Sequence, residues 1–160
     1  MIRRLLLVAL LLPWGVGWAQ QPDTVKQVST TQEPQWSIPE RSLDLYAGLR
    51  SNGGTNFMMG AKYSHRLPSS RTFAGAGFLE VAFASPTETL LGALFQYMPL
   101  HRLLLETGPG VAFGGGTDFF WRVSGEYELQ IRRLSVIPKG YLDFVNGTTV
   151  VGYGIAIGRR

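Results

Sequence analysis

The residues from 119 to 145 alternate between two chemical classes, and this alternation restricts the possible folds more than any other feature of the chain. The odd positions from Trp121 to Ile131 are mainly apolar or aromatic, whereas the even positions between them are polar or charged. A repeat of two residues places successive side chains on opposite faces of a β-strand. One face of this strand must therefore meet an apolar environment and the other a polar one.

The same stretch also predicts how two strands pair. If Arg132 and Arg133 form a two-residue turn, Glu126 lies opposite Lys139 on the polar face. The same register predicts two further pairs, which are Arg122 with Asp143 and Trp121 with Phe144. A slip of one residue would bring charges to the apolar side, so a single register satisfies both faces.

The first 19 residues predict a secretory signal peptide. Arg3 and Arg4 precede the apolar run 5–12, and Gly17 and Ala19 supply small residues for a cut after Ala19. The run is shorter than the roughly 20 apolar residues of a membrane-spanning helix. A retained inner-membrane anchor is the alternative interpretation.

Charge and cysteine content exclude several classes of function. Loss of Arg3 and Arg4 with the signal peptide lowers the formal charge from +4 to +2, because all eleven acidic residues follow it. Nucleic-acid binding requires a concentrated basic face, so we expect no nucleic-acid partner. The chain has no cysteine, which excludes disulfides, thiolate metal sites and a thiol nucleophile.

Residues 20–41 are rich in Gln, Thr, Ser and Pro and lack periodicity, which predicts a flexible exported tail. Trp36 and Ile38 could dock on another surface, although isolated apolar residues in such tails more often have no partner. From residue 42 to residue 160 the composition shifts to glycine, aromatic and aliphatic residues. We place the only domain boundary at this shift.

The domain 42–160 contains eight alternating segments, and each is close to the roughly 9 to 11 residues that a tilted strand needs to cross hydrocarbon. The segments are 42–50, 56–65, 71–84, 89–98, 103–113, 119–131, 134–145 and 148–159. The turn Asn146-Gly147 is the strongest hairpin signal, because a type I′ turn needs positive φ at both positions. The pattern predicts an all-β fold, an eight-stranded antiparallel up-and-down transmembrane β-barrel.

We expect the lumen of this barrel to be polar and filled. An eight-stranded barrel has interior space only for side chains, which excludes an open pore. The inward positions include Tyr46, Glu80, Gln96 and Glu106, in addition to the charged residues paired below. Buried charges are tolerated when they are paired. The predicted lumen ion pairs are Asp44 with Lys62, Arg122 with Asp143, and Glu126 with Lys139. The dispersed carboxylates predict no metal site, and we expect no cofactor.

The outward aromatic residues predict two bands, as in the interfacial girdles of membrane barrels. One band contains Phe57, Phe83, Phe113, Phe119, Trp121 and Phe144, and the other contains Tyr63, Phe73, Tyr97 and Tyr127. A soluble lipocalin-like barrel would show the inverse pattern, with an apolar lumen and a polar exterior.

The signal peptide, the polar tail and the eight alternating segments together resemble small Gram-negative outer-membrane β-barrels of the broad OmpA and OmpX type. The resemblance covers about 120 residues and implies a cell outer membrane location, a periplasmic tail and insertion by the barrel-assembly machinery. Such barrels end in an aromatic residue after alternating apolar ones. Here the alternation is present but the chain stops without the aromatic, as shown by Val151, Tyr153, Ile155, Ile157, Arg159 and Arg160.

Two prolines conflict with ideal strands. Pro109 and Pro138 each lack the N–H that a strand donates to its neighbour, and neither lies at an evident sheet edge. Local β-bulges would accommodate them.

The resemblance implies location and fold more than activity. Our first hypothesis is a structural or envelope-integrity role for a monomeric barrel in contact with outer-membrane lipids. Two alternatives are a lipid-modifying enzyme similar to the lipid A deacylases and a ligand-binding or adhesive barrel. The deacylases use a His-x-Ser pair, but His65 and His101 are each followed two positions later by leucine. Ser64 adjoins His65, yet neighbouring strand residues point to opposite faces. We therefore expect no enzymatic activity.

Arginines gather at the end of the barrel that carries both chain termini. They are Arg41, Arg66, Arg71, Arg102, Arg132, Arg133, Arg159 and Arg160. The opposite end has Glu88, Asp118 and Arg50. Each basic residue near an anionic membrane surface contributes about 1 kcal/mol of attraction, so we expect a rim that binds lipid headgroups. The alternative is that these arginines occupy turns and fix the depth of the barrel.

Overall fold

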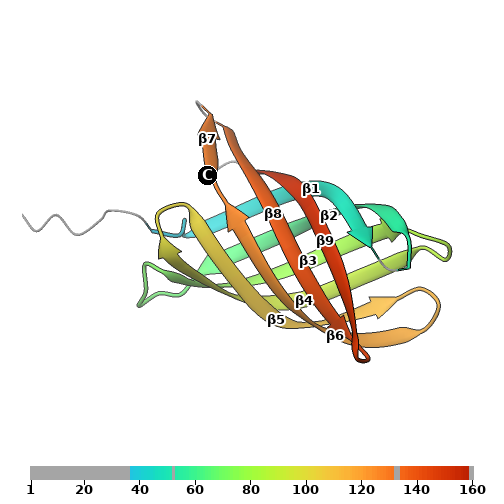
Figure 1. Cartoon of the computed structure of the whole chain (residues 1–160). Helices are drawn as coiled ribbons and strands as arrows, with labels where there is room; N and C mark the ends of the chain where they lie inside the picture. The colour runs from blue at the N-terminus through green and yellow to red at the C-terminus, as the bar shows by residue number, and fades with distance from the viewer. Residues whose placement is uncertain (1–36, 52, 132–133, 159–160) are drawn as a thin grey trace, which may run out of the picture. The chain divides into compact units, whose positions relative to one another are not determined.

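The computed structural model describes residues 37–51, 53–131 and 134–158, most of which lie in β-strands (Figure 1). The strands are β1 (Arg41–Ser51), β2 (Thr55–Arg66), β3 (Phe73–Phe83), β4 (Glu88–Leu100), β5 (Leu103–Phe113), β6 (Thr117–Tyr127), β7 (Leu129–Ile131), β8 (Leu134–Val145) and β9 (Thr148–Gly158). The predicted signal peptide, most of the tail and the turn Arg132-Arg133 lie outside the described residues. Within those residues no helix is long and apolar enough to cross a membrane.

The sheet closes on itself. Strands β1 to β6 pair antiparallel in sequence order, β8 pairs with β9, and β9 returns to β1. Both β6 and β7 pair with β8 in one register, so they are two parts of one strand that is interrupted at Glu128. The β6–β8 pairing completes the ring, and the nine segments form an eight-stranded barrel. The predicted fold class is confirmed.

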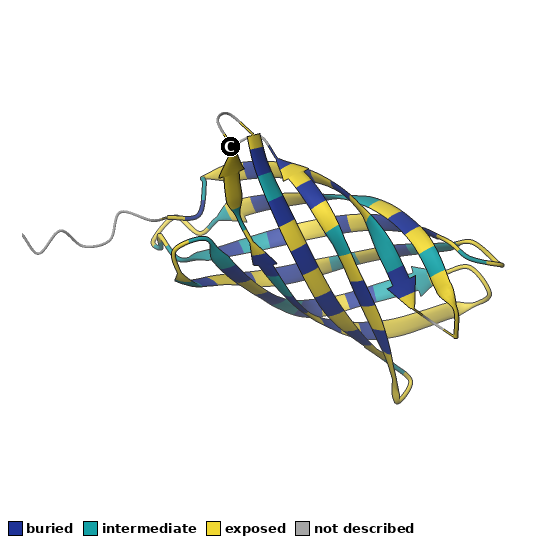
Figure 2. Ribbon diagram, turned by 45° about the horizontal axis from the view of Figure 1, so that its top comes forward, coloured by how far each residue is buried: buried dark blue, intermediate teal, exposed yellow. Residues whose placement is uncertain are grey.

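The register predicted from residue pairing and turn chemistry is also confirmed. Glu126 lies opposite Lys139, and the same alignment continues along β7. At the β8–β9 turn, Asn146 and Gly147 have φ angles of 46° and 79°, both positive as a type I′ turn requires. The strands alternate buried and exposed residues as the period-two pattern predicts (Figure 2), except for β7, whose three residues are all exposed.

Each proline lies in a continuous strand pair on one side and beside a gap in the pairing on the other, without a bulge at either position. The β5–β6 register runs unbroken past Pro109, and the β8–β9 register runs unbroken past Pro138. The interruption at Glu128 lies beside Pro138, which has no N–H to offer the neighbouring strand. A register shift is found elsewhere, between Tyr97 and Leu100 in the β4–β5 pair.

The lumen is filled, and apolar side chains share it with the charged groups. Its apolar cluster consists of Tyr46, Met58, Ala76, Phe78, Ala82, Leu90, Leu94, Phe120, Ile137, Tyr141 and Ala156. These closely packed apolar side chains fill the lumen space between the charged groups.

Each of four inward aromatic rings lies over a glycine on the adjacent strand. The cross-strand pairs are Tyr46 with Gly60, Phe78 with Gly92, Phe120 with Gly110, and Tyr141 with Gly152. A Cβ atom added at Gly152 would lie 2.0 Å from Cζ of Tyr141, so no larger residue fits beneath this ring. The glycines thus make the space into which the rings fold.

Substitution of one such glycine should destabilise the barrel. We expect Gly152→Ala to lower the free energy of unfolding by about 1 to 3 kcal/mol, because the new methyl group overlaps the Tyr141 ring. Gly140→Ala, on the partner strand, is the matched control, since its Cβ would meet no atom closer than 3.9 Å. Urea titrations of the refolded barrel in detergent micelles measure both values. Equal losses at the two positions would contradict the ring-over-glycine account.

Candidate functional site

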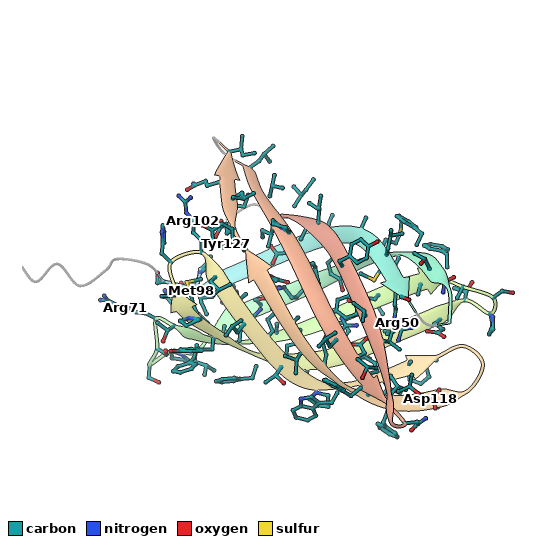
Figure 3. All side chains as sticks on the ribbon, in the orientation of Figure 1. Arg50, Arg71, Met98, Arg102, Asp118 and Tyr127 are labelled. Carbon is teal, nitrogen blue, oxygen red and sulfur yellow. The ribbon has the colours of Figure 1, made fainter. Side chains whose placement is uncertain are left out.

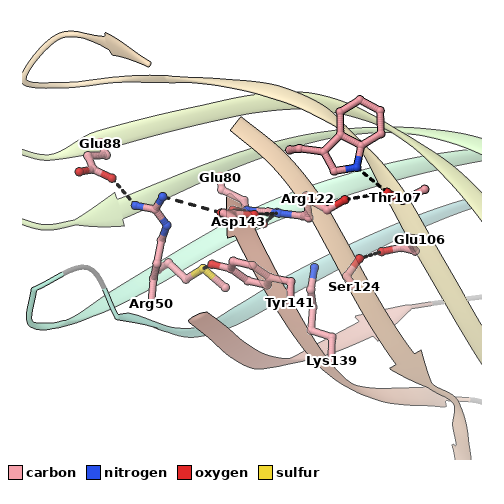
Figure 4. Close-up of polar contacts among 12 residues, drawn as sticks. Arg50, Glu80, Glu88, Glu106, Thr107, Arg122, Ser124, Lys139, Tyr141 and Asp143 are labelled. Carbon is pink, nitrogen blue, oxygen red and sulfur yellow. Dashed lines mark hydrogen bonds and ion pairs between the residues drawn. The ribbon is translucent and has the colours of Figure 1, made fainter. Parts of the chain in front are cut away.

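Arg122, on β6, is the central charged residue of the lumen (Figure 4). Its Nε donates to Asp143 Oδ1 at 2.6 Å and its Nη2 donates to Asp143 Oδ2 at 2.8 Å. The same guanidinium donates to both carboxylate oxygens of Glu80, with Nη2 at 2.8 Å from Oε2. Two bidentate, charge-assisted contacts therefore hold a side chain that is 1% exposed. The structure brings the predicted Arg122–Asp143 pair together and adds Glu80.

Aromatic rings complete the surroundings of Arg122. The guanidinium carbon lies 3.9 Å from the Tyr141 ring centroid and 4.4 Å from that of Phe78, within the range of cation–π attraction. Tyr46 donates its hydroxyl to Glu80 Oε1 at 2.6 Å. The rings that fill the lumen therefore also stabilise its buried charge.

A second cationic centre is formed by Lys62 on β2. Its Nζ donates to Glu106 Oε1 at 2.7 Å and to Glu126 Oε2 at 2.6 Å. Glu106 also accepts hydrogen bonds from Gln96 Nε2 at 2.6 Å and from Ser124 Oγ at 2.8 Å. Lys62 thus joins β2 to β5 and β6 across the lumen.

The other two predicted ion pairs are looser than these contacts. Lys139 Nζ lies 3.7 Å from Glu126 Oε1, and it also lies 3.7 Å from the ring centroid of Tyr46. Asp44 Oδ2 lies 4.0 Å from Lys62 Nζ, and among the described residues neither Asp44 oxygen accepts a hydrogen bond. Direct cross-strand neighbours are therefore not the closest partners of Glu126 and Lys62.

Arg50 lies inside the barrel rather than on its outer surface. It is 3% exposed and forms an ion pair with Glu88, and its Nη2 lies 3.7 Å from Asp143 Oδ2. At the same end Asn146 Nδ2 donates to Asp118 Oδ1 at 2.9 Å. The strand pattern predicts Arg50 at this end of the barrel but does not predict its inward partners.

The predicted aromatic bands all lie on the outer face. Phe57 stacks on Phe83 with ring centroids 5.8 Å apart, and Phe73 stacks on Tyr97 at 4.9 Å. Tyr127 lies at the same end of the barrel as Arg71, which precedes Phe73 by two residues (Figure 3). The remaining members are also exposed, namely Tyr63, Phe113, Phe119, Trp121 and Phe144. Their role as membrane girdles stays a prediction.

The predicted arginine rim is partly described. Arg71 and Arg102 lie at one end of the barrel and Arg50 and Asp118 at the other (Figure 3). Arg41 begins β1 at the first of these ends and is exposed. Further predicted members lie outside the described residues, namely Arg132, Arg133, Arg159 and Arg160.

The end of the predicted tail is packed against the barrel. Ile38 is 3% exposed and joins an apolar cluster with Ala74, Met98 and Leu104. Its N–H donates to the carbonyl of Arg71 at 2.9 Å, and its carbonyl accepts from Arg66 Nη1 at 3.1 Å. Ile38 is one of the two tail residues that could dock on another surface. Its contact partners could not be predicted, because the residues around it show no periodic pattern. One rim arginine, Arg66, is engaged here.

The histidines do not form a hydrolase site with Ser64. Ser64 is buried and points inward, whereas the adjacent His65 is exposed on the outer face. His101 is exposed in the β4–β5 turn. Among the described residues no group of three or more histidine and carboxylate side chains could hold a metal ion.

Two double-mutant cycles that share Glu126→Gln test the lumen network. We expect Glu126 to couple more strongly to Lys62, at 2.6 Å, than to Lys139, at 3.7 Å, when each lysine is replaced by methionine. Removing one partner of a buried pair costs about 3 to 5 kcal/mol, so urea unfolding can resolve the couplings. A larger coupling for Lys139 would show that the direct cross-strand pair dominates.

Comparison with solved structures identifies the fold. A designed transmembrane β-barrel matches with a TM-score of 0.55 and 13% identity, and the match covers 76% of this chain and 98% of that chain. Neisserial surface protein A matches with a TM-score of 0.47 and 13% identity, covering 74% of this chain and 92% of that chain.

The attachment invasion locus protein Ail of Yersinia pestis, solved with the heparin analogue sucrose octasulfate, has a TM-score of 0.44 and 9% identity. That match covers 74% of this chain and 95% of that chain. No family model and no curated protein matches the sequence. The chain therefore has the fold of an eight-stranded transmembrane β-barrel.

Proposed function

We propose that this protein is a small outer-membrane barrel that supports the integrity of the envelope and forms no open pore. The observation that carries the proposal is the occupied lumen, in which Arg122 is bound by two carboxylates and packed between aromatic rings. A solute could pass only if this buried network were broken, at a cost of several kcal/mol. A role in conduction has correspondingly little support.

The two alternative functions have less support from the geometry. A lipid-modifying enzyme needs a nucleophile within hydrogen-bonding reach of its base, and Ser64 and His65 point to opposite faces. An adhesive barrel needs a binding surface on its loops, yet the connections around Gly53, Pro86 and Gly115 are short.

Membrane lipids are the partners that fit this surface. The arginines predicted at the end carrying both termini would meet the periplasmic leaflet, where anionic headgroups attract basic residues. The opposite end has Asp118 and the Arg50–Glu88 pair but no comparable group of arginines among the described residues, so it is the less favourable side for lipopolysaccharide phosphates. A monomer is the favoured state, because ring closure pairs the wall strands on both sides and, among the described residues, the three-residue segment β7 pairs with β8 alone.

The proposed orientation predicts which loops face the cell exterior. An affinity tag inserted at Gly115 should be labelled on intact cells, whereas a tag at Pro68 should be labelled only after the outer membrane is opened. The reason is that eight strands return both termini to the same side, and Gly115 lies at the opposite end. Labelling of the Pro68 tag on intact cells would show that the barrel is inverted.

Deletion of the gene tests the proposed role. We expect the deletion strain to take up more of a large antibiotic or dye than the parent, with uptake restored by the intact chain. The acyl composition of its lipid A should match that of the parent. Lipid A that gains or loses an acyl chain on deletion would favour the enzyme instead, and unchanged uptake would remove the integrity role.

A further inference from the structure

An apolar groove of about 1290 Å³ lies in the outer wall of the barrel. Its lining residues come mainly from β1, β2 and β9, with residues of β3 and β8 at its edges. These five strands are consecutive in the barrel wall (Figure 1). Its floor is made by small residues, and its sides are made by larger exposed ones such as Leu45, Met59 and Tyr153. Apart from Tyr46 and Lys139, which point into the lumen, its lining side chains lie on the face that a transmembrane barrel turns toward hydrocarbon.

The floor is low because small outward residues lie among large ones on adjacent strands. Ala47 on β1 has Met59 and Ile155 as its cross-strand partners, and Ala61 on β2 is paired with Leu45. Both alanines line the groove, and their partners Leu45, Met59 and Ile155 are exposed on the outer face. Methyl groups thus form the bottom of the groove between longer side chains.

The shape and polarity of the groove suit an acyl chain better than a second barrel. A two-fold dimer would place the same patch of each copy against the other. Two concave patches in that arrangement would leave a void between them, which forfeits dispersion contacts. A flexible hydrocarbon chain can instead follow the depression and contact its floor and both sides.

Charge at one end of the groove indicates the kind of headgroup. Arg41 and His65 are cross-strand partners on the outer face of the two strands that form the groove's centre. Arg41 is four residues, or roughly 13 Å, from Leu45 in the groove. At the other end of these strands the outward residues are Ser51, Thr55 and Phe57, which carry no charge.

We propose that the groove holds one acyl chain of an anionic phospholipid, with the headgroup phosphate bound by Arg41. The inference rests on the proposed function for the identity of the leaflet, which is the periplasmic one. It adds a defined site on one side of the barrel to a rim that would otherwise attract lipid around its whole circumference.

Native mass spectrometry of the purified barrel tests the site with phosphatidylglycerol as the probe. We expect Ala47→Leu, which fills the floor, and Arg41→Gln, which removes the headgroup contact, each to lower retained lipid by roughly tenfold. Loss of burial for about two methylene groups accounts for the change in Ala47→Leu, and loss of one basic residue beside an anionic headgroup accounts for the change in Arg41→Gln. Phosphatidylcholine should be retained less than phosphatidylglycerol by the unaltered chain.

Matched controls lie on the opposite side of the barrel. Ala93→Leu adds the same side chain to an exposed position on β4, and Arg102→Gln removes a rim arginine from the β4–β5 turn. Neither residue lines the groove, so both variants should retain phosphatidylglycerol. Ala61→Leu provides a second floor variant if Ala47→Leu does not fold into a heat-modifiable barrel.

Several outcomes would overturn the proposal. They are equal losses in the groove and control variants, equal retention of the two phospholipids, and a dimer mass that Ala47→Leu abolishes. The measurement uses purified protein in detergent, so it is independent of orientation and cell phenotype. An inverted tag result would remove the proposed leaflet and leave groove retention unchanged, which separates the two failures.

Discussion

Hydrocarbon offers no partner for a free peptide N–H or carbonyl group, and each unpaired group there costs several kcal/mol. The pairing of β6 with β8 therefore matters more than any single side chain, because it converts a sheet with two open edges into a ring. Closure also creates an interior that water cannot freely enter. Every charge that alternation directs inward must then find a partner inside.

The lumen meets this requirement by combining charge pairing with close packing. Arg122 is held by acids on two different strands, and the rings that surround it lie flat because glycines face them. The same residues thus satisfy electrostatics and fill volume. Disturbing the packing would also weaken the charge pairing, because a displaced ring would admit water to the Arg122 side chain, which is 1% exposed.

The sequence contains the information that fixes local pairing. Period-two alternation, the turn Asn146-Gly147 and the opposition of Glu126 to Lys139 were sufficient to predict strand number and register. Contacts across the lumen could not be predicted in this way. Lys62 reaches Glu106 on β5, three strands away in the sheet, and that distance is bridged by curvature that no local pattern encodes.

The groove is not predicted from the sequence, and for Ile38 only the possibility of docking is predicted. A depression in the wall depends on which small and large outward side chains become neighbours on adjacent strands. The position of Ile38 depends on contacts with residues from three strands, and an irregular segment carries no periodicity that would reveal its partner. Sequence patterns therefore predict the strands of the barrel better than they predict the groove on its outer face or the packing of Ile38 at its end.

The packing of Ile38 has a mechanical consequence. Tension applied to the chain before Ser37 reaches β1 only through a segment that is hydrogen-bonded to Arg66 and Arg71. These contacts would yield first and would shield the terminal pairs of β1 from peeling. The segment around Ile38 therefore takes up the force first, so that tension on the preceding chain is resisted before the pairing of β1 with its neighbours is broken.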